Sequence, residues 1–130
     1  MIKENNQLKI LIIDDDRFLL DMYSLKFKKY GLEVDTSSNS EKALEKLKIP
    51  EAYDIVLLDI IMPGMDGLEL LKHMRENKMA PNAVVIMLTN QADDFEKAKA
   101  LDVSGYIIKA TTIPSEVVEQ VLKIYKNKQK

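Results

Sequence analysis

Aspartates follow directly after two of the most apolar stretches of the sequence. Asp14, Asp15 and Asp16 come after the run LKILII, and Asp59 comes after DIVLL. An aspartate at a helix start accepts backbone N–H hydrogen bonds, and we predict that Asp16 has this capping role. Three consecutive carboxylates exceed what a cap requires, because like charges at about 4 Å repel by roughly 4 kcal/mol at an effective dielectric of 20. We therefore expect a cation near Asp14 and Asp15.

The acidic residues point to a particular kind of metal site. Open α/β sheets place their sites outside the carboxyl ends of the strands, so Asp14, Asp15 and Asp59 converge in one crevice if their two strands are neighbours. Hard oxygen ligands favour Mg²⁺, or Mn²⁺, over zinc. A metal that is bound by two carboxylates has open coordination positions for water and a phosphate. Taken alone, Asp59 is also compatible with an ordinary turn after a strand.

Two further polar residues end apolar runs, Thr89 in VVIMLTNQ and Lys109 in GYIIKA. Each has an ordinary explanation in isolation, since a strand-end threonine often caps a helix and a strand-end lysine is often solvated. In one five-stranded sheet, however, both would lie around the same crevice as the acids. A metal, an ammonium group and a hydroxyl donor together suit the stabilisation of the negative charge of a phosphoryl group.

The elements that must position these residues alternate along the chain. Three of the five strand-like runs are apolar without alternation, which predicts burial on both faces, whereas the second is more polar and suits a sheet edge. The alternation predicts a parallel sheet with helices on both sides. The expected strands span residues 8–13, 33–37, 54–58, 83–88 and 104–109, and the expected helices span residues 16–30, 40–48, 67–77, 92–101 and 113–127.

Composition narrows the class of protein. The 130 residues, 46% hydrophobic and 31% charged, are typical of one globular domain. The formal net charge of −2 gives no basic field for nucleic acid. Cysteine is absent, which excludes thiolate metal sites and disulfides. No apolar run approaches the roughly 20 residues that span a bilayer, and no secretion signal begins the chain, so we predict a cytoplasmic protein without a membrane contact.

Four segments together resemble the receiver domain of two-component response regulators, in particular chemotaxis-type regulators. They are LKILIIDDD, DIVLLDIIMPGMDGLELL, VVIMLTNQ and GYIIKA, of which the stretch from Asp59 to Gly67 is the most specific. The resemblance implies a flavodoxin-like (βα)5 fold, a doubly wound parallel sheet in strand order 2-1-3-4-5. It also implies that residues 1–130 form a single receiver domain, with a core at about 8–127 and no output domain.

The resemblance assigns roles to the acidic residues and to one loop position. Asp59 matches the acid that accepts a phosphoryl group from a histidine kinase. Asp15 matches a direct Mg²⁺ ligand, and Asp14 matches an acid that reaches the metal through water. Ile61 matches the position whose backbone carbonyl completes the metal site.

The remaining roles concern phosphate binding and switching. Thr89 matches the hydroxyl that binds a phosphoryl oxygen and moves on activation, and Tyr106 matches the aromatic residue whose rotamer follows it. Lys109 matches the lysine that pairs with Asp59 or its phosphate.

The resemblance also implies partners. It predicts a phosphorelay domain that is not an enzyme in its own right and catalyses only its own phosphorylation and dephosphorylation. The expected partners are a histidine kinase or phosphotransfer protein, a downstream protein target or output domain, and a second copy in a phosphorylation-dependent homodimer, with no direct contact to nucleic acid.

The sequence departs from the family pattern at three places. Ala110 replaces the usual proline after the lysine, and Asn90 replaces a small residue after the threonine, where it could narrow access to the phosphoryl group. The segment from Thr89 to Leu101 is short, so we expect a short or shifted fourth helix.

The alanine at position 110 affects the peptide bond that precedes it. A cis bond costs about 2.5–4 kcal/mol before a residue other than proline, against roughly 0.5–1 kcal/mol before proline. We therefore predict a trans Lys109–Ala110 bond, with Lys109 still pointing at Asp59.

Two other classes of protein compete with this interpretation. A phosphatase of the haloacid dehalogenase type is suggested by the D-x-D of Asp14 and Asp16. That class expects Thr or Val directly after the second acid, where this chain has Arg17, and a later acidic pair, which does not follow Lys109. A flavodoxin-like electron carrier would need a Ser/Thr/Gly-rich phosphate loop after the first strand, and none is present.

Overall fold

The computed structural model describes residues 7–129, which fold around one five-stranded parallel sheet. Residues 1–6 and 130, the ends of the expected 1–130 domain, lie outside the described residues. The strand order is β2-β1-β3-β4-β5, as predicted. The chain adds β2 on one side of β1 and the later strands on the other, so the switch point of this parallel sheet lies between β1 and β3. The strands are β1 (Lys9–Ile13), β2 (Glu33–Ser37), β3 (Ile55–Leu58), β4 (Val84–Thr89) and β5 (Gly105–Ile108).

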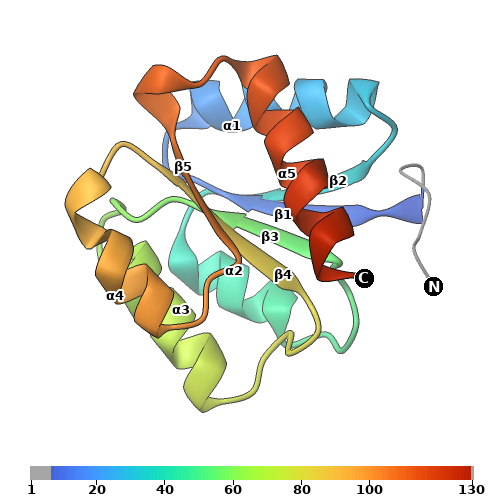
Figure 1. The fold of residues 1–130 in the computed structure, drawn as a ribbon. Coiled ribbons are helices and arrows are strands. Elements are labelled where there is room, and N and C mark those ends of the chain that lie inside the picture. Colours follow the sequence, from blue (N-terminus) through green and yellow to red (C-terminus); the bar gives the residue numbers. More distant parts are fainter. Residues whose placement is uncertain (1–6, 130) are drawn as a thin grey trace.

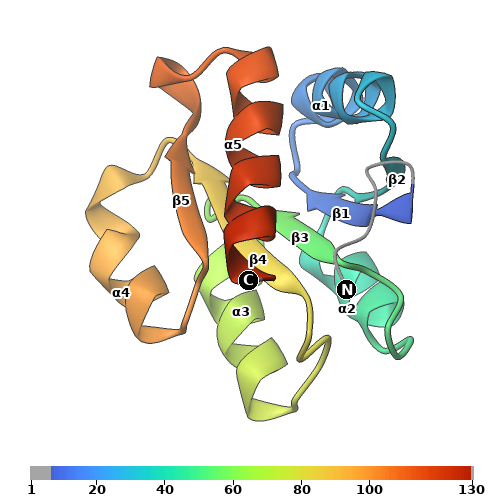
Figure 2. The same ribbon diagram turned by 45° about the vertical axis from the view of Figure 1, so that its right-hand side comes forward.

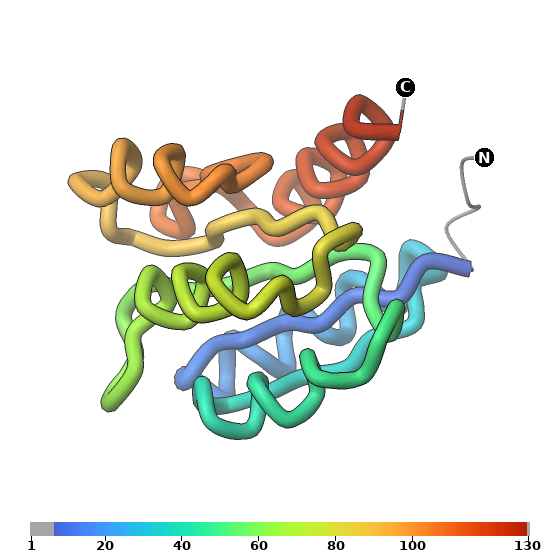
Figure 3. Tube along the Cα trace, turned by 90° about the horizontal axis from the view of Figure 1, so that it is seen from below, coloured from blue at the N-terminus to red at the C-terminus, as the bar shows by residue number. Residues whose placement is uncertain are grey.

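Helices cover both faces of the sheet, which makes the fold doubly wound (Figure 1). Two helices, α1 and α5, lie against one face, and Figure 2 shows them side by side. Figure 3, viewed from below, shows the other three side by side along the opposite face. The helices are α1 (Arg17–Lys29), α2 (Ser40–Leu47), α3 (Gly67–Glu76), α4 (Phe95–Ala100) and α5 (Pro114–Lys128).

The sheet divides the core into two clusters because its strands are buried on both faces. Alternate residues of β1 show this division: Ile10 and Ile12 belong to the cluster that contains residues of α1 and α5, whereas Leu11 and Ile13 belong to the cluster that contains residues of α2, α3 and α4. All residues of β3 and β4 are buried, as the apolar runs IVLL and VVIML predict, and Thr89 at the end of β4 is buried with them. The polar strand β2 lies at the sheet edge, which confirms that prediction.

Local sequence signals set the helix boundaries. The Asp16 side chain accepts a hydrogen bond from the Leu19 N–H at 3.2 Å, which confirms Asp16 as the cap of α1. Asp66 and Glu69 form a reciprocal capping box at the start of α3. Gly31, with φ of 93°, follows the end of α1 in the left-handed conformation that glycine adopts without strain. These signals fix the direction in which each helix leaves the sheet.

The predicted elements agree with the structure to within two residues at nearly every boundary. The exception is the expected helix at 92–101, which begins as a 3-10 turn, Ala92–Asp94, and becomes α-helical only over the six residues of α4. The fourth helix is therefore short, as the length of its segment predicted. None of the helices between residues 7 and 129 has the length and apolar character needed to cross a membrane.

A polar cluster holds the edge strand β2 to its neighbours. Asp35 accepts hydrogen bonds from the Lys46 Nζ of α2 at 2.7 Å and from the Tyr53 hydroxyl at 2.5 Å. Burial alone would raise the pKa of Asp35, but the hydrogen bonds from Lys46 and Tyr53 outweigh it and lower that pKa. Burial and the neighbouring carboxylate raise the pKa of Tyr53. The cluster thus links β2, α2 and the segment before β3.

Candidate functional site

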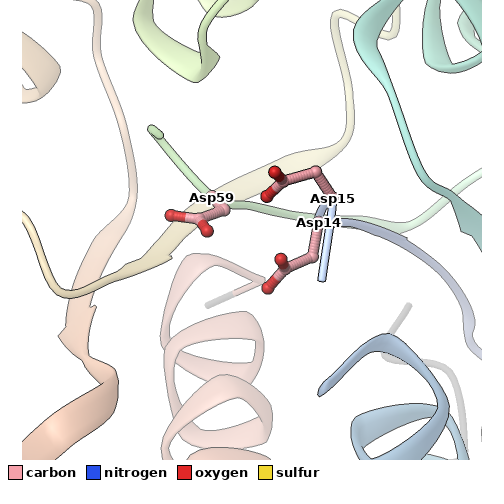
Figure 4. Close-up of side chains that lie close together, drawn as sticks. All are labelled: Asp14, Asp15 and Asp59. Carbon is pink, nitrogen blue, oxygen red and sulfur yellow. The ribbon is translucent and has the colours of Figure 1, made fainter. Parts of the chain in front are cut away.

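The acids converge because β1 and β3 are neighbours and end at the same level. Ile13 pairs with Leu58 in the parallel register, and the next residues are Asp14 and Asp59. The Asp59 N–H donates to the Ile13 carbonyl at 3.0 Å, so the backbone at this end is fixed. Figure 4 shows Asp14 and Asp15 on the segment after β1, with Asp59 beside them after β3.

The three carboxylates are close enough to bind one ion. An oxygen from each of Asp14, Asp15 and Asp59 lies within 4.8 Å of the others. Asp14 and Asp59 are buried, whereas Asp15 is exposed at the mouth of the site. Asp14 also accepts a hydrogen bond from the Asp16 N–H at 2.9 Å, which orients its carboxylate. This cluster can hold a metal, and its oxygen donors suit a hard divalent cation.

Lys109 supplies the positive charge of the site. It follows β5 by one residue, and its Nζ lies 2.6 Å from Asp14 Oδ2 and 2.8 Å from Asp59 Oδ2. Burial alone would lower the pKa of Lys109, but its hydrogen bonds and charge interactions with both carboxylates outweigh burial and raise that pKa. Burial raises the pKa of Asp14 more than the lysine lowers it. Lys109 therefore stays protonated between the two acids.

Thr89 and Tyr106 are joined through the backbone of one intervening residue. The Gln91 N–H donates to Thr89 Oγ1 at 3.2 Å, and the Tyr106 hydroxyl donates to the Gln91 carbonyl. Thr89 is fully buried at the end of β4, and the ring of Tyr106 packs edge-on against Phe95 of α4. Movement of the Thr89 hydroxyl therefore acts on the backbone of Gln91, the residue whose carbonyl also holds Tyr106.

A cavity of about 420 Å³ opens over the acids. Most of the residues predicted for the site line it, and only Tyr106 among them lies outside its lining. Ile61 lines the cavity, and its side chain is mostly exposed. The lining residues are Asp14, Asp15, Asp16, Leu19, Asp59, Ile61, Thr89, Asn90 and Lys109.

Gly67 allows the backbone after Asp59 to approach the start of α3. A Cβ atom added to Gly67 would lie 2.0 Å from the Asp59 carbonyl oxygen, which is a severe clash with backbone. The Gly67 N–H donates to the Ile60 carbonyl at 2.7 Å. The absence of a side chain at Gly67 therefore helps to place Asp59 at the site.

A hydrogen bond between Asn90 and Ala110 is a feature that sequence reasoning missed. The Ala110 N–H donates to Asn90 Oδ1 at 2.7 Å, and the Lys109–Ala110 peptide is trans, as predicted. Both residues depart from the family pattern, but nothing in the sequence indicates that they pair. The one available signal is that alanine, unlike proline, has an N–H to donate.

Another cavity, larger than the one over the acids, lies elsewhere. It measures about 530 Å³ and lies between the carboxyl ends of α2 and α3, where His73 and Met79 contribute to its lining. It contains a single acidic residue, Glu51, and so lacks the grouped carboxylates that a metal-assisted reaction needs. The chemistry of the residues, rather than cavity size, identifies the site after β1 and β3.

Comparison with known proteins agrees with this geometry. Residues 10–121 match the family model of the response regulator receiver domain. The chain is 31% identical over 120 residues to the transcriptional regulatory protein ResD of Bacillus subtilis, covering 91% of this chain and 48% of ResD. The chain spans about half the length of the curated relatives it matches.

Solved structures show the same fold. The response regulator TrrA of Thermotoga maritima, solved in complex with Mg²⁺-BeF, superposes with a TM-score of 0.78 at 31% identity, covering 91% of this chain and 99% of that one. The chemotaxis protein CheY4 of Vibrio cholerae gives a TM-score of 0.81 at 25% identity, covering 90% and 98%. These matches give no support to the haloacid dehalogenase alternative. The chain belongs to the receiver domain family of two-component response regulators.

Proposed function

We propose that Asp59 is the residue of this receiver domain that accepts a phosphoryl group. The observation that carries the proposal is the position of the Asp59 carboxylate, which lies 2.8 Å from the Lys109 ammonium and beside two further acids under an open cavity. An Asp59 oxygen attacks the phosphorus of a phosphohistidine whose other ring nitrogen is protonated, the phosphorus–nitrogen bond breaks, and an acyl phosphate forms while the partner's histidine leaves as neutral imidazole. Lys109 holds the carboxylate before transfer and an oxygen of the new phosphate afterwards.

The donor set fits Mg²⁺, with Mn²⁺ as the alternative. Asp15 and Asp59 would bind it directly, Asp14 would act through water, and the Ile61 carbonyl would complete the protein ligands. The related TrrA was solved in complex with Mg²⁺-BeF, which supports this choice of metal. When bound, the ion would neutralise negative charge on the phosphoryl group.

Phosphorylation would switch the molecule through Thr89 and Tyr106. A phosphoryl oxygen on Asp59 attracts the Thr89 hydroxyl, which then stops accepting from the Gln91 N–H. The backbone of Gln91 can then reorient, and the Tyr106 hydroxyl loses the Gln91 carbonyl that holds it outside the cavity. One charge thereby selects between two packings of the surface formed by Phe95 and Tyr106.

We infer the partners from the same chemistry. A histidine kinase or phosphotransfer protein would donate the phosphoryl group, and a downstream protein target or output domain, or a second copy of the domain, would bind the switched surface. The domain would work in the cytoplasm and catalyse no reaction beyond its own phosphorylation and dephosphorylation.

The test is phosphorylation by acetyl phosphate with Mg²⁺, followed by mapping of the modified residue by mass spectrometry. We expect one phosphoryl group on Asp59 and none in Asp59→Asn. Asp102→Asn is the matched control, because Asp102 is exposed with φ of 60°, a conformation that asparagine tolerates. Labelling of Asp59→Asn to the wild-type level would show that another residue accepts the group.

A further inference from the structure

The hydrogen bond between Asn90 Oδ1 and the Ala110 N–H, here called the Asn90 bridge, joins two loops at the mouth of the site. Asn90 directly follows the end of β4, and Ala110 lies in the 3-10 turn Lys109–Thr111 after β5. The donor–acceptor distance is 2.7 Å, short for an N–H···O bond, and both residues are exposed. The bridge is therefore a contact across the cavity rim rather than a part of the packed core.

The bridge acts on the residue next to it in the chain. The peptide that donates to Asn90 is the one that joins Lys109 to Ala110, so its orientation fixes the backbone from which the lysine side chain leaves. The Lys109 side chain is only 9% exposed and must reach Asp14 and Asp59 at 2.6 and 2.8 Å. A long side chain with four rotatable bonds keeps such a position only if its backbone is held, because ordering it costs up to about 2 kcal/mol of rotamer entropy.

Two other hydrogen bonds hold this turn more weakly. The Thr112 N–H donates to the Lys109 carbonyl at 3.4 Å, and Thr111 Oγ1 donates to the Ile108 carbonyl at 3.4 Å. Both distances are long, and both bonds are local. Of these three bonds, the Asn90 bridge is the shortest and the one that reaches another loop.

We propose that Asn90 is a positioning residue that, through the Ala110 N–H, aims Lys109 at the phosphoacceptor. Because Asn90 also follows Thr89 directly, the bridge connects the loop that carries the switch hydroxyl to the loop that carries the lysine. The link to phosphoryl transfer rests on the proposed function of Asp59, whereas the hold on Lys109 is independent of it.

The first test measures, without any phosphorylation, how firmly the Asn90 bridge keeps the Lys109 side chain in place. Lysines are acetylated with a limiting amount of N-hydroxysuccinimidyl acetate, and the extent at Lys109 is read by mass spectrometry relative to exposed Lys123. Asn90→Ala removes the acceptor and Ala110→Pro removes the donor, so both variants should raise Lys109 acetylation. Ala110→Gly keeps the N–H and should match the wild type. Unchanged acetylation of Lys109 in Asn90→Ala overturns the proposal.

The second test connects the bridge to the reaction. In acetyl phosphate with saturating Mg²⁺, we expect the maximal phosphorylation rate of Asn90→Ala and of Ala110→Pro to fall about two- to tenfold, the range expected for one net hydrogen bond. Because both remove the same bond, the double variant should be no slower than the slower single variant, and Mg²⁺ affinity should not change. Additive losses overturn the proposal.

The two arms separate failure of this inference from failure of the proposed function. Increased Lys109 acetylation in a protein whose wild type is never phosphorylated would reject Asp59 as the acceptor and retain the positioning role. Normal phosphorylation with unchanged Lys109 acetylation in Asn90→Ala would reject the positioning role of Asn90 and retain Asp59 as the acceptor. Unfolding curves for each variant show that a slower rate does not arise from unfolded protein.

Discussion

At the scale of single residues, Lys109 determines the charge balance of the site. Three carboxylates and one ammonium group leave two negative charges within a small volume. That residual charge equals the charge of one divalent cation in magnitude. The arrangement explains why the chain can keep three acids together before any ion binds: the lysine pairs with the two buried ones, and solvent screens exposed Asp15.

We predict that Asp15→Asn weakens Mg²⁺ binding by about tenfold or more, because one carboxylate ligand is worth at least about 1.4 kcal/mol in a site with few protein ligands. Without Mg²⁺, the same variant should unfold at a higher urea concentration, since it relieves repulsion among the acids. Calorimetric titration and urea unfolding measure the two effects. Asp16→Asn is the control, because asparagine caps a helix as well as aspartate does. Equal Mg²⁺ affinity in both variants would remove Asp15 from the metal site.

The convergence of Asp14, Asp59, Thr89 and Lys109 on one cavity was predictable from the sequence because each lies at the end of an apolar run. In a parallel sheet the carboxyl ends of all strands meet at one edge, so Asp14, Asp59 and Thr89 were placed together once the strands were recognised. The Asn90 bridge was not predictable. It joins two loops whose backbone conformations no periodicity specifies, and it depends on a distance that only the assembled sheet sets.

At the scale of elements, α4 depends on a neighbour for its stability. Its six residues are far fewer than the roughly 12–15 that an isolated helix needs. Arg75 of α3 compensates, because its Nε donates to the Leu101 carbonyl and its Nη2 to the Asp102 carbonyl, both at 3.0 Å. These carbonyls follow the end of α4 and lack partners within that helix.

We predict that Arg75→Met lowers the free energy of unfolding by about 1.5–2 kcal/mol, the lower part of the range for hydrogen bonds to a charged group. It should also accelerate amide exchange in α4 more than in α1, because the end of α4 loses its donors. Hydrogen-exchange mass spectrometry measures this difference. Lys72→Met, on the exposed face of the same helix, is the control. Exchange in α4 that is equal in both variants would assign its stability to other contacts.

The element predictions succeeded where tertiary contacts agree with local preference. Except for the polar edge strand β2, the strands needed only their apolar runs and the turn residues between them. The segment 92–101 differed in its first turn because Ala92–Asp94 forms a 3-10 turn without a side-chain cap, and local sequence does not separate this from an α-helical start.

At the scale of the whole molecule, stability comes from the two cores on either side of the sheet, and a few polar contacts connect its edge to them. The fold was predictable at this scale because the alternation of strands and helices allows few arrangements of a parallel sheet. The cluster of Asp35, Lys46 and Tyr53 was not predicted, since the sequence gives no sign that these three residues approach one another.

We predict that this cluster makes stability depend on pH. Because the native fold lowers the pKa of Asp35 below its ordinary value of 3.8, its contribution is complete above that pH and is lost as the pH falls through the native pKa. Asp35→Asn should therefore unfold more easily at neutral pH, by about 1 kcal/mol for partly exposed partners. The difference from wild type should shrink as the pH falls below the ordinary pKa of Asp35 and through its lowered native pKa.

Urea unfolding across this pH range tests the prediction. Glu45→Gln is the matched control, because Glu45 pairs with Lys48 at 3.0 Å while both side chains are mostly exposed, and such pairs contribute little. A stability difference for Asp35→Asn that stays constant from neutral to acid pH would mean that ionisation of Asp35 has no part in it.

The Asn90 bridge also constrains how this sequence can change over generations. A proline at position 110 would leave the Asn90 oxygen without its donor, and a small residue at position 90 would leave the Ala110 N–H without its acceptor. Each residue can form the hydrogen bond only when the other is present, so a lineage that changes one is expected to change both. Among relatives that share this bridge, positions 90 and 110 should covary, although they lie 20 residues apart in the chain.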